Sequence, residues 1–378
     1  MRQRKKLHIK SIKIVGFKSV ANITLADMTA YSVFAGANGA GKSNLLDAMA
    51  FVSAVIDSGA KKAIKDFRGF SQIHCYKVRG TKSRVFEFSL DATLNKKSLS
   101  YTLKIHDLDK DPRLEEKLHI AEQLIFDRKK GMPLQLWDAD KNTFIDVPKM
   151  PDDVSALLFT QQKSDLYQYL TNIRIFRFDP LGAKEPDKSS VDNTELDPLG
   201  HNVASMLACL EKNLPFRESV TEWMSLIVMG MEKVFAEEQR LDSRTILKFK
   251  EKGTKEHFPA NLISDGTIYA LCIITAVLSR AEGIGITLIE EPERGIHPQA
   301  IQQLIELIRD NARPEHPVFI TTHSESVVRA SKVEELWLVD KIEGKTFLKN
   351  AAKNSVELKR LNLDMAWLSN IFGGGLPW

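Results

Sequence analysis

The stretch Gly36-Ala37-Asn38-Gly39-Ala40-Gly41-Lys42-Ser43 has the glycine spacing and the Lys-Ser ending of a phosphate-binding loop. It lies between a short apolar run, Ala30–Ala35, and a segment with helical periodicity, Asn44–Val55. This order of strand, glycine loop and helix surrounds a phosphate with backbone N–H groups and the positive end of a helix. A chance glycine turn would not be expected between two such elements. The sequence therefore predicts a nucleotide-binding protein.

The residue types in this loop match the chemistry of a bound nucleotide. Small residues allow the backbone to approach the β-phosphate closely. Lys42 is placed to reach the β- and γ-phosphates, and Ser43 to offer its hydroxyl to Mg²⁺. The candidate nucleotide contacts are Gly36, Asn38, Gly39, Ala40, Gly41, Lys42, Ser43 and Asn44.

Two later apolar runs end in groups that can act on a phosphate. Thr287–Glu293 ends in consecutive carboxylates, and Val318–Ser324 ends at His323. Glu290 is placed to hold Mg²⁺, directly or through water, and Glu291 to polarise an attacking water. Each pattern alone is weak, because many strands end at solvated charges and a single histidine is more often structural. Together with the loop they predict one shared sheet edge.

A third segment, Asn261–Thr267, precedes a strongly apolar helix. A serine at a helix N-terminus is usually a plain cap, and this is the default interpretation of Ser264. Here, however, Ser264 lies 26 residues before Glu290, in a chain that also carries the phosphate loop and the histidine strand. That combination indicates a second role for the start of this helix.

Composition sets the broad class. The chain has 378 residues, 43% hydrophobic and 27% charged, which is typical of a globular protein. Its longest mostly apolar run, Ala270–Leu278, is too short to span a bilayer. The basic start has no apolar core after it, so we expect no export signal and a cytoplasmic protein. Three scattered cysteines exclude a disulfide frame, and a net charge of +4 does not decide on a nucleic-acid partner.

The remaining pattern outlines the other elements. Leu7–Val15 alternates like a half-buried strand, with Gly16 expected to break it. A helix is expected over Asp152–Leu170, a strand over Asn172–Phe178 and a mobile loop over Asp179–Pro198. Antiparallel strands are expected at Val85–Leu90, Leu99–Ile105, Ile120–Phe126 and Thr143–Val147. A helical stripe that favours core packing over a partner face comprises Val220, Trp223, Met224, Ile227, Met231 and Val234.

With these motifs in this order, the chain resembles the ABC-type ATPase heads, in which Asn261–Thr267 corresponds to the signature motif. It is most similar to the RecF/SMC/OLD branch, and especially to the prokaryotic stand-alone heads called AAA-type, class 21. The features that carry this likeness are Ile14–Ser19, Glu290–Glu293 followed by Ile296–Pro298, and the closing Trp367 and Gly373–Gly375. Ile263 and Asp265 replace the leucine and first glycine of the transporter signature, which favours the RecF-like branch.

The resemblance implies an α/β P-loop fold of ABC-ATPase type, with a mixed central sheet, an antiparallel β subdomain and a helical lobe. It implies a single head over residues 1–378. Its expected parts are a P-loop core with the antiparallel subdomain (1–150), a helical lobe with the mobile loop (151–244), a core with the signature, acidic strand and switch histidine (245–350), and a C-terminal segment (351–378).

The resemblance also implies residue roles. Glu291 is the expected catalytic carboxylate and His323 the switch histidine that senses the γ-phosphate, while Lys18 supports the phosphates. Glu290 replaces the usual Asp, which favours a metal contact through water. Ser264, Asp265 and Gly266 are expected to act on ATP bound to a second subunit. The candidates for a Q-loop are Gln161, Gln162 and the turn after Phe178.

The implied mechanism is ATP- and Mg²⁺-dependent closure of two heads, with slow hydrolysis that reopens them. Three outputs compete: a sensor or scaffold that controls a separately encoded effector in antiphage defence, a DNA-binding ATPase of genome maintenance, and a transporter ATPase. We rank the first slightly ahead of the second, because no fused nuclease, TOPRIM-like module or long coiled coil is evident. The 222 positions between Lys42 and Ser264 disfavour the transporter, and the signature helix disfavours a hexameric ring machine.

Overall fold

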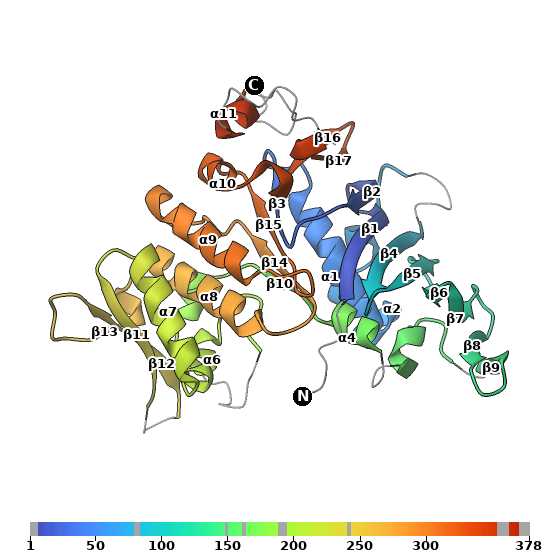
Figure 1. Ribbon diagram of the computed structural model, residues 1–378, viewed down its shortest axis with the longest axis horizontal. Helices are drawn as coiled ribbons and strands as arrows, with labels where there is room; N and C mark the ends of the chain where they lie inside the picture. Colours follow the sequence, from blue (N-terminus) through green and yellow to red (C-terminus); the bar gives the residue numbers. More distant parts are fainter. Residues whose placement is uncertain are drawn as a thin grey trace.

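Helix α1 (Lys42–Ser58) lies between two β-sheets, and this arrangement positions the phosphate-binding loop (Figure 1). The protein is described from a computed structural model, which covers residues 7–78, 84–147, 150–160, 164–187, 195–239, 243–353 and 363–369. Within these residues no helix is both long and apolar enough to cross a membrane.

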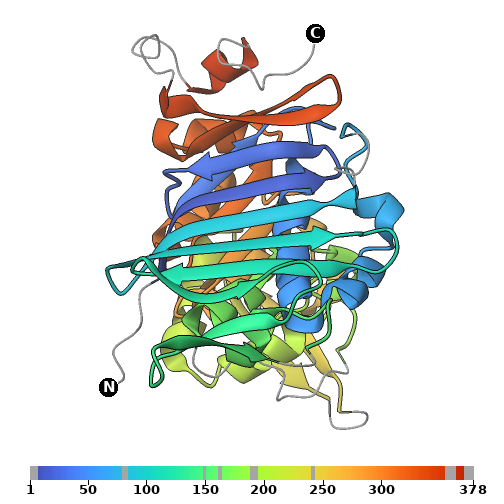
Figure 2. The ribbon, with the colours of Figure 1, turned by 90° about the vertical axis from the view of Figure 1, so that its right-hand side faces the viewer.

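The first sheet is antiparallel and, in the part of the chain described, has the order β2-β1-β4-β5-β6-β7-β8-β9 (Figure 2). Alternating buried and exposed residues along its strands bury one face against α1. Its strands are β1 (Leu7–Phe17), β2 (Val20–Ala26), β4 (Phe86–Leu94), β5 (Lys97–His106), β6 (Arg113–Ile120), β7 (Gln123–Arg128), β8 (Leu134–Asp138) and β9 (Thr143–Val147).

The second sheet carries the strands that end at the site, in the order β10-β14-β15-β3-β16-β17 over the described residues. Strands β10, β14, β15, β3 and β16 are parallel to their neighbours, and β17 is antiparallel to β16. The bounds are β3 (Tyr31–Ala35), β10 (Ile173–Phe176), β14 (Ile286–Glu290), β15 (Val318–Thr322), β16 (Leu336–Ile342) and β17 (Lys345–Asn350). Their apolar runs match a sheet that is buried on both faces.

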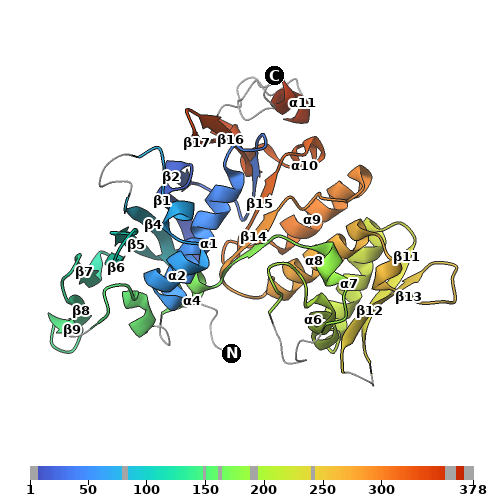
Figure 3. The ribbon, with the colours of Figure 1, turned by 180° about the vertical axis from the view of Figure 1, so that it is seen from behind.

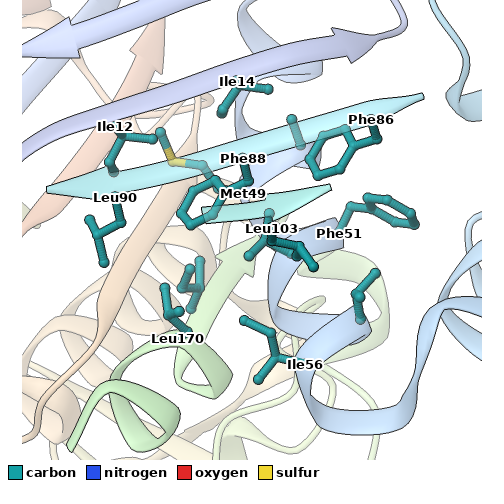
Figure 4. Close-up of a cluster of buried hydrophobic side chains, with 14 of the residues drawn as sticks. Ile12, Ile14, Met49, Phe51, Ile56, Phe86, Phe88, Leu90, Leu103 and Leu170 are labelled. Atoms are coloured by element: carbon teal, nitrogen blue, oxygen red, sulfur yellow. The ribbon is translucent and has the colours of Figure 1, made fainter. Parts of the chain in front are cut away.

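One hydrophobic core joins α1 to the antiparallel sheet. Met49, Phe51 and Ile56 of α1 are buried among side chains of β1, β4 and β5, such as Ile14 and Phe88 (Figure 4). The helix ends at Gly59, where φ is 86°, and the N–H of Gly59 donates to the carbonyl of Val55. The packing of these buried side chains holds α1 against the sheet, with its first turn next to the glycine loop.

A second core covers the other face of the parallel sheet with α8 (Asp265–Arg280) and α9 (Ile301–Asn311) (Figure 3). Beyond them lie α6 (Val203–Leu210), α7 (Leu214–Ile227) and a small sheet of β11 (Met231–Glu238), β12 (Thr245–Glu251) and β13 (Phe258–Pro259). The other helices are α2 (Ala60–Asp66), α3 (Phe70–Ile73), α4 (Asp165–Thr171), α5 (Pro180–Ala183), α10 (Glu325–Ala330) and α11 (Leu363–Leu368).

Two expectations about the antiparallel sheet were wrong. β1 does not end at Gly16 but continues to Phe17. Gly16 has a positive φ of 85°, and a Cβ at this position would clash with the carbonyl of Val85, so glycine allows the strand to continue. Ile120–Phe126 is not one strand: Ala121 and Glu122 both have positive φ and form the turn between β6 and β7.

Three expectations about the middle of the chain were also wrong. Met231 and Val234 belong to strand β11 and not to the helix, because α7 ends at Ile227 and Gly230 has a φ of 81°. The helix expected over Asp152–Leu170 is a 3₁₀ turn, Ala156–Thr160, followed by the separate α4. The expected loop Asp179–Pro198 contains α5, and its residues 188–194 lie outside the described part.

Candidate nucleotide-binding and hydrolysis site

The predicted motifs meet at one edge of the parallel sheet. In the strand register, Glu290 of β14 is beside Thr321 of β15, and Thr322 is beside Ala35 of β3. Hydrogen bonds continue past the strand ends, from the Gly36 N–H to the Thr322 carbonyl (3.3 Å) and from the Glu291 N–H to the Thr321 carbonyl (2.9 Å). The glycine loop, the two acids and His323 therefore lie side by side, as the sequence predicts.

The loop has the conformation that its glycines allow. Gly39 and Gly41 have φ values of 80° and 102°, in the region that other residues avoid. The Lys42 ammonium donates to the carbonyls of Gly36 (2.7 Å) and Ala37 (3.0 Å), so the lysine folds back over its own loop. Burial lowers the pKa of Lys42, and the carboxylates of Glu291, Glu293 and Glu290 oppose this shift. The field of these three acids thus reaches the lysine.

Asn44 has a structural partner within the protein. Its amide donates to the Ser19 hydroxyl (2.7 Å), Ser19 bonds to the Thr346 hydroxyl (2.7 Å), and Thr346 donates to the Ala40 carbonyl (3.0 Å). Because Thr346 gives its proton to Ala40, Ser19 must be the donor to Thr346. This relay ties the phosphate loop to β17, and no local sequence pattern predicts it.

Glu291 and His323 form the centre of the proposed catalytic machinery. His323 Nδ1 lies 3.0 Å from Glu291 Oε1, and Glu291 has a φ of 47°. The Tyr269 hydroxyl of α8 donates to the carbonyls of both Glu290 and Glu291 at 3.0 Å. The side chains of Glu291 and His323 line an open cleft of about 690 Å³, to which α11 contributes Trp367.

Behind this pair, Glu293 is buried and accepts a hydrogen bond from the Thr322 hydroxyl (2.6 Å). Its Oε1 lies 4.0 Å from His323 Nδ1. Burial raises the pKa of the Glu293 carboxyl, and the Thr322 hydrogen bond opposes that rise. The sequence motif includes this residue, but its position behind the histidine emerges only in the structure.

Glu290 points into a cluster of charges that includes two residues missed in the sequence. Nη2 of Arg177 lies 2.8 Å from Glu290 Oε1 and 2.5 Å from Asp47 Oδ1. Lys18, at a φ of 48°, places its ammonium 2.5 Å from the other oxygen of Asp47. Lys18 therefore reaches the site through Asp47. Arg177 directly follows β10, the strand beside β14. This position after a strand was the one sequence signal that could have indicated a role for Arg177 at the site.

The oxygen donors here fit Mg²⁺. In nucleotide sites this ion takes one or two protein oxygens, with waters and phosphates as the other ligands. Ser43 is exposed in the first turn of α1, and Glu290 is half-buried at the end of β14. A hydroxyl and a carboxylate are hard oxygen ligands of the kind that this ion prefers.

The expected signature residues start α8. The Ser264 hydroxyl accepts from the Thr267 N–H (3.3 Å), which is the ordinary cap, and the side chain is exposed. Lys184 contacts Asp265 at 2.5 Å. A Cβ on Gly266 would clash with the carbonyl of Gly295, so glycine allows α8 to pack on the loop after Glu291.

Two of the Q-loop candidates, Gln161 and Gln162, and the closing Gly373–Gly375 lie outside the described residues. In the turn after Phe178, Asp179 caps α5 through the Leu181 N–H. The side chain near the acids comes from Arg177, one residue before Phe178.

The chain is similar over most of its length to several known proteins. A curated protein of Helicobacter pylori (strain ATCC 700392 / 26695), described as "ATP/GTP phosphatase", is 24% identical over 353 residues, covering 85% of this chain and 86% of its own. The SMC head bound to the C-winged helix domain of ScpA superposes with a TM-score of 0.60 at 14% identity, over 92% of this chain and 99% of that one. An SMC head with an extended coiled coil, bound to the C-terminal domain of ScpA derived from Pyrococcus furiosus, gives 0.52 at 14% identity, over 94% and 99%.

The fold has the ABC/SMC-head-type architecture of a P-loop protein, which confirms the predicted fold class. Residues 32–329 match the family model described as "AAA domain, putative AbiEii toxin, Type IV TA system". The chain belongs to this family, and the predicted resemblance is confirmed.

Proposed function

We propose that the protein binds ATP with Mg²⁺ at this site, closes into a dimer around the nucleotide, and through that state controls a separately encoded effector in prokaryotic antiphage defence. The observation that supports dimer closure is the start of α8. Ser264 is exposed there, and Gly266 packs directly on the loop that follows Glu291. A second subunit can thus approach the positive end of α8 and the catalytic acid together.

The hydrolysis step follows from the side chains at the sheet edge. Lys42 and the loop N–H groups would bind the phosphates, and the Ser43 hydroxyl and Glu290 carboxylate would hold Mg²⁺, directly or through water. Glu291 accepts a proton as the water oxygen bonds to the γ-phosphorus, and the bond to the β–γ bridging oxygen breaks to give ADP and phosphate. Mg²⁺ supplies charge neutralisation for the phosphate oxygens.

His323 is the residue proposed to report the γ-phosphate. Its Nδ1 contacts Glu291, and the ring is partly exposed to the cleft. Loss of the γ-phosphate then removes contacts that hold the second subunit, so the nucleotide favours one of two states by differential contact. Slow turnover suits a protein whose closed state is the signal.

The effector role is supported by the family, whose description refers to a toxin–antitoxin system. The experiment uses the Glu291→Gln protein, purified with ATP and Mg²⁺ from cells that express its neighbouring genes. We expect the product of a neighbouring gene to co-purify without nucleic acid, and its activity to change when ATP is replaced by ADP. Lys42→Ala is the control that should lose the complex.

The opposite result would favour the alternative. A complex that contains DNA, dissociates on nuclease treatment and holds no second protein would indicate a DNA-binding ATPase of genome maintenance. Lys10 and Lys13 are exposed on β1 and would be the first residues to test for that contact.

A further inference from the structure

Arg177 stands between two carboxylates that come from different elements. It directly follows β10, and its backbone N–H donates to the Pro198 carbonyl (2.9 Å), which fixes the chain at this point. A single nitrogen, Nη2, contacts both Asp47 of α1 (2.5 Å) and Glu290 of β14 (2.8 Å). The guanidinium therefore bridges the helix that carries Ser43 and the strand that carries the acids.

The charges of this cluster balance without any metal. Asp47 and Glu290 contribute two negative charges, and Arg177 and Lys18 contribute two positive charges. The carboxylates are 14% and 19% exposed and Arg177 is 39% exposed, so water screens these contacts only in part. The ion pairs with Glu290 and Asp47 raise the pKa of Arg177 although burial lowers it. The arginine is fully charged at any working pH.

This balance conflicts with metal binding at the same carboxylate. Asp47 lies one turn after Ser43 on α1, so the two side chains share a helix face. Glu290 is the carboxylate that the proposed Mg²⁺ site requires. A divalent ion there would face a guanidinium on the same carboxylate, and the two cations repel each other strongly in a partly buried site.

We propose that Arg177 is a positioning residue that competes with Mg²⁺ for Glu290. Without metal, Arg177 neutralises Glu290 and holds it against α1. When the metal binds, Arg177 gives up Glu290 and keeps its contact with Asp47. The arginine thus sets how strongly metal and nucleotide depend on one another. This inference rests on the proposed Mg²⁺–nucleotide site.

The test measures the linkage between metal and nucleotide, with fluorescent N-methylanthraniloyl-ADP as the probe. ADP is not hydrolysed and does not close the proposed dimer, so the readout is binding alone. For each protein the dissociation constant for the probe is measured in EDTA and in MgCl₂. The constant in EDTA divided by the constant in MgCl₂ gives the coupling between metal and nucleotide. We expect Arg177→Gln to increase this ratio on the order of tenfold over wild type, because the competing charge is gone.

Two variants serve as controls. Arg174→Gln removes a positive charge from β10, three residues before Arg177, where Arg174 pairs with Glu195 at 2.7 Å, and should leave the ratio unchanged. Arg177→Lys keeps the charge and should stay near the wild-type ratio. A ratio for Arg177→Gln equal to that of Arg174→Gln, or lower than wild type, would overturn the competition. Absence of nucleotide binding by the wild-type protein in both conditions would instead overturn the proposed function.

Discussion

The side chains of Glu291 and His323 meet at 3.0 Å because the ends of two neighbouring parallel strands bring them together. The carbonyl of Glu291 is fixed by Tyr269, and Glu293 lies behind the histidine with its Oε1 4.0 Å from Nδ1. A proton acceptor held in this way can act on water without first reorganising. The same geometry makes His323 separable from nucleotide binding, since Lys42 belongs to α1 and the glycine loop lies between β3 and α1.

His323→Ala is therefore expected to lower the turnover number by about tenfold or more while the dissociation constant for ATP changes by less than about threefold. Steady-state phosphate release and nucleotide titration give the two values. His297→Ala is the matched control, because His297 is also exposed and, within the described part of the chain, accepts a hydrogen bond only from the nearby Gln299 N–H. Equal turnover for the two variants would show that His323 has no part in hydrolysis.

At the scale of elements, the relay from Asn44 through Ser19 and Thr346 to Ala40 joins α1, the β1–β2 turn, β17 and the phosphate loop. Thr346 is 2% exposed, so its hydroxyl has no access to water as an alternative partner. The loop is held in shape by a strand more than 300 positions later in the chain, as the separation of 306 positions between Ala40 and Thr346 shows.

Thr346→Val preserves the shape and removes both hydrogen bonds of the hydroxyl. We expect the free energy of unfolding to fall by about 1–3 kcal/mol, and nucleotide affinity to fall with it because the loop is no longer held. Urea denaturation and nucleotide titration measure the two effects. An unchanged nucleotide affinity in a destabilised protein would show that the relay serves stability alone.

At the opposite end of the parallel sheet, His316 is buried beside Thr287. Arg280 donates to the Thr287 hydroxyl (2.8 Å), and the oxygen of that hydroxyl lies 2.7 Å from His316 Nε2. Burial, together with the charges of Arg280 and Arg313, lowers the pKa of His316 to about 3. The neutral ring contributes stability above the unfolded-state pKa, and this contribution is lost as the pH falls through the folded-state pKa.

The free energy of unfolding of His316→Gln should therefore fall less than that of wild type as the pH is lowered from about 6.5 to about 3. The shift corresponds to at most about 4–5 kcal/mol of wild-type stability lost across that window. The quantity to compare is the difference in free energy of unfolding between variant and wild type at each pH, which cancels the carboxylates common to both. A difference that does not vary with pH would contradict the assignment.

The same elements show which parts of the fold and of the candidate site can be predicted from the sequence alone. The glycine loop, the acidic strand and the histidine strand were found because each motif is local and each ends an apolar run. Arg177 and Asp47 were missed because their contacts join positions 130 apart, and no local pattern marks such a pair. Met231 and Val234 fit a helical spacing, but Gly230 turns the chain and β11 pairs with β12, so pairing with a distant strand outweighed the local period.

In the complete molecule, the proposed mechanism requires two copies of the chain. Ser264 has only the contacts of a helix cap within its own chain, at least among the described residues, and it is exposed. An arginine there would put a bulky side chain at the proposed interface without touching the phosphate loop. The smaller change Ser264→Ala removes the cap and is expected to cost about 1 kcal/mol of stability.

Ser264→Arg is therefore expected to keep nucleotide binding and to lose hydrolysis, because each site needs the other subunit. Ser264→Ala serves as the control for the lost cap and should retain part of the activity. Nucleotide titration and phosphate release separate the two effects. Full hydrolysis by Ser264→Arg would contradict the role of Ser264 across the interface.

The most direct measurement is the mass of Glu291→Gln by light scattering, with and without ATP and Mg²⁺. The variant should bind ATP without hydrolysing it, and its mass should rise from the monomer value of 42.6 kDa to twice that value only when both ATP and Mg²⁺ are present. Adding Ser264→Arg to the same protein should abolish the rise. A mass that stays at the monomer value with ATP bound, or a dimer that persists in the double variant, would contradict the ATP-sandwiched dimer.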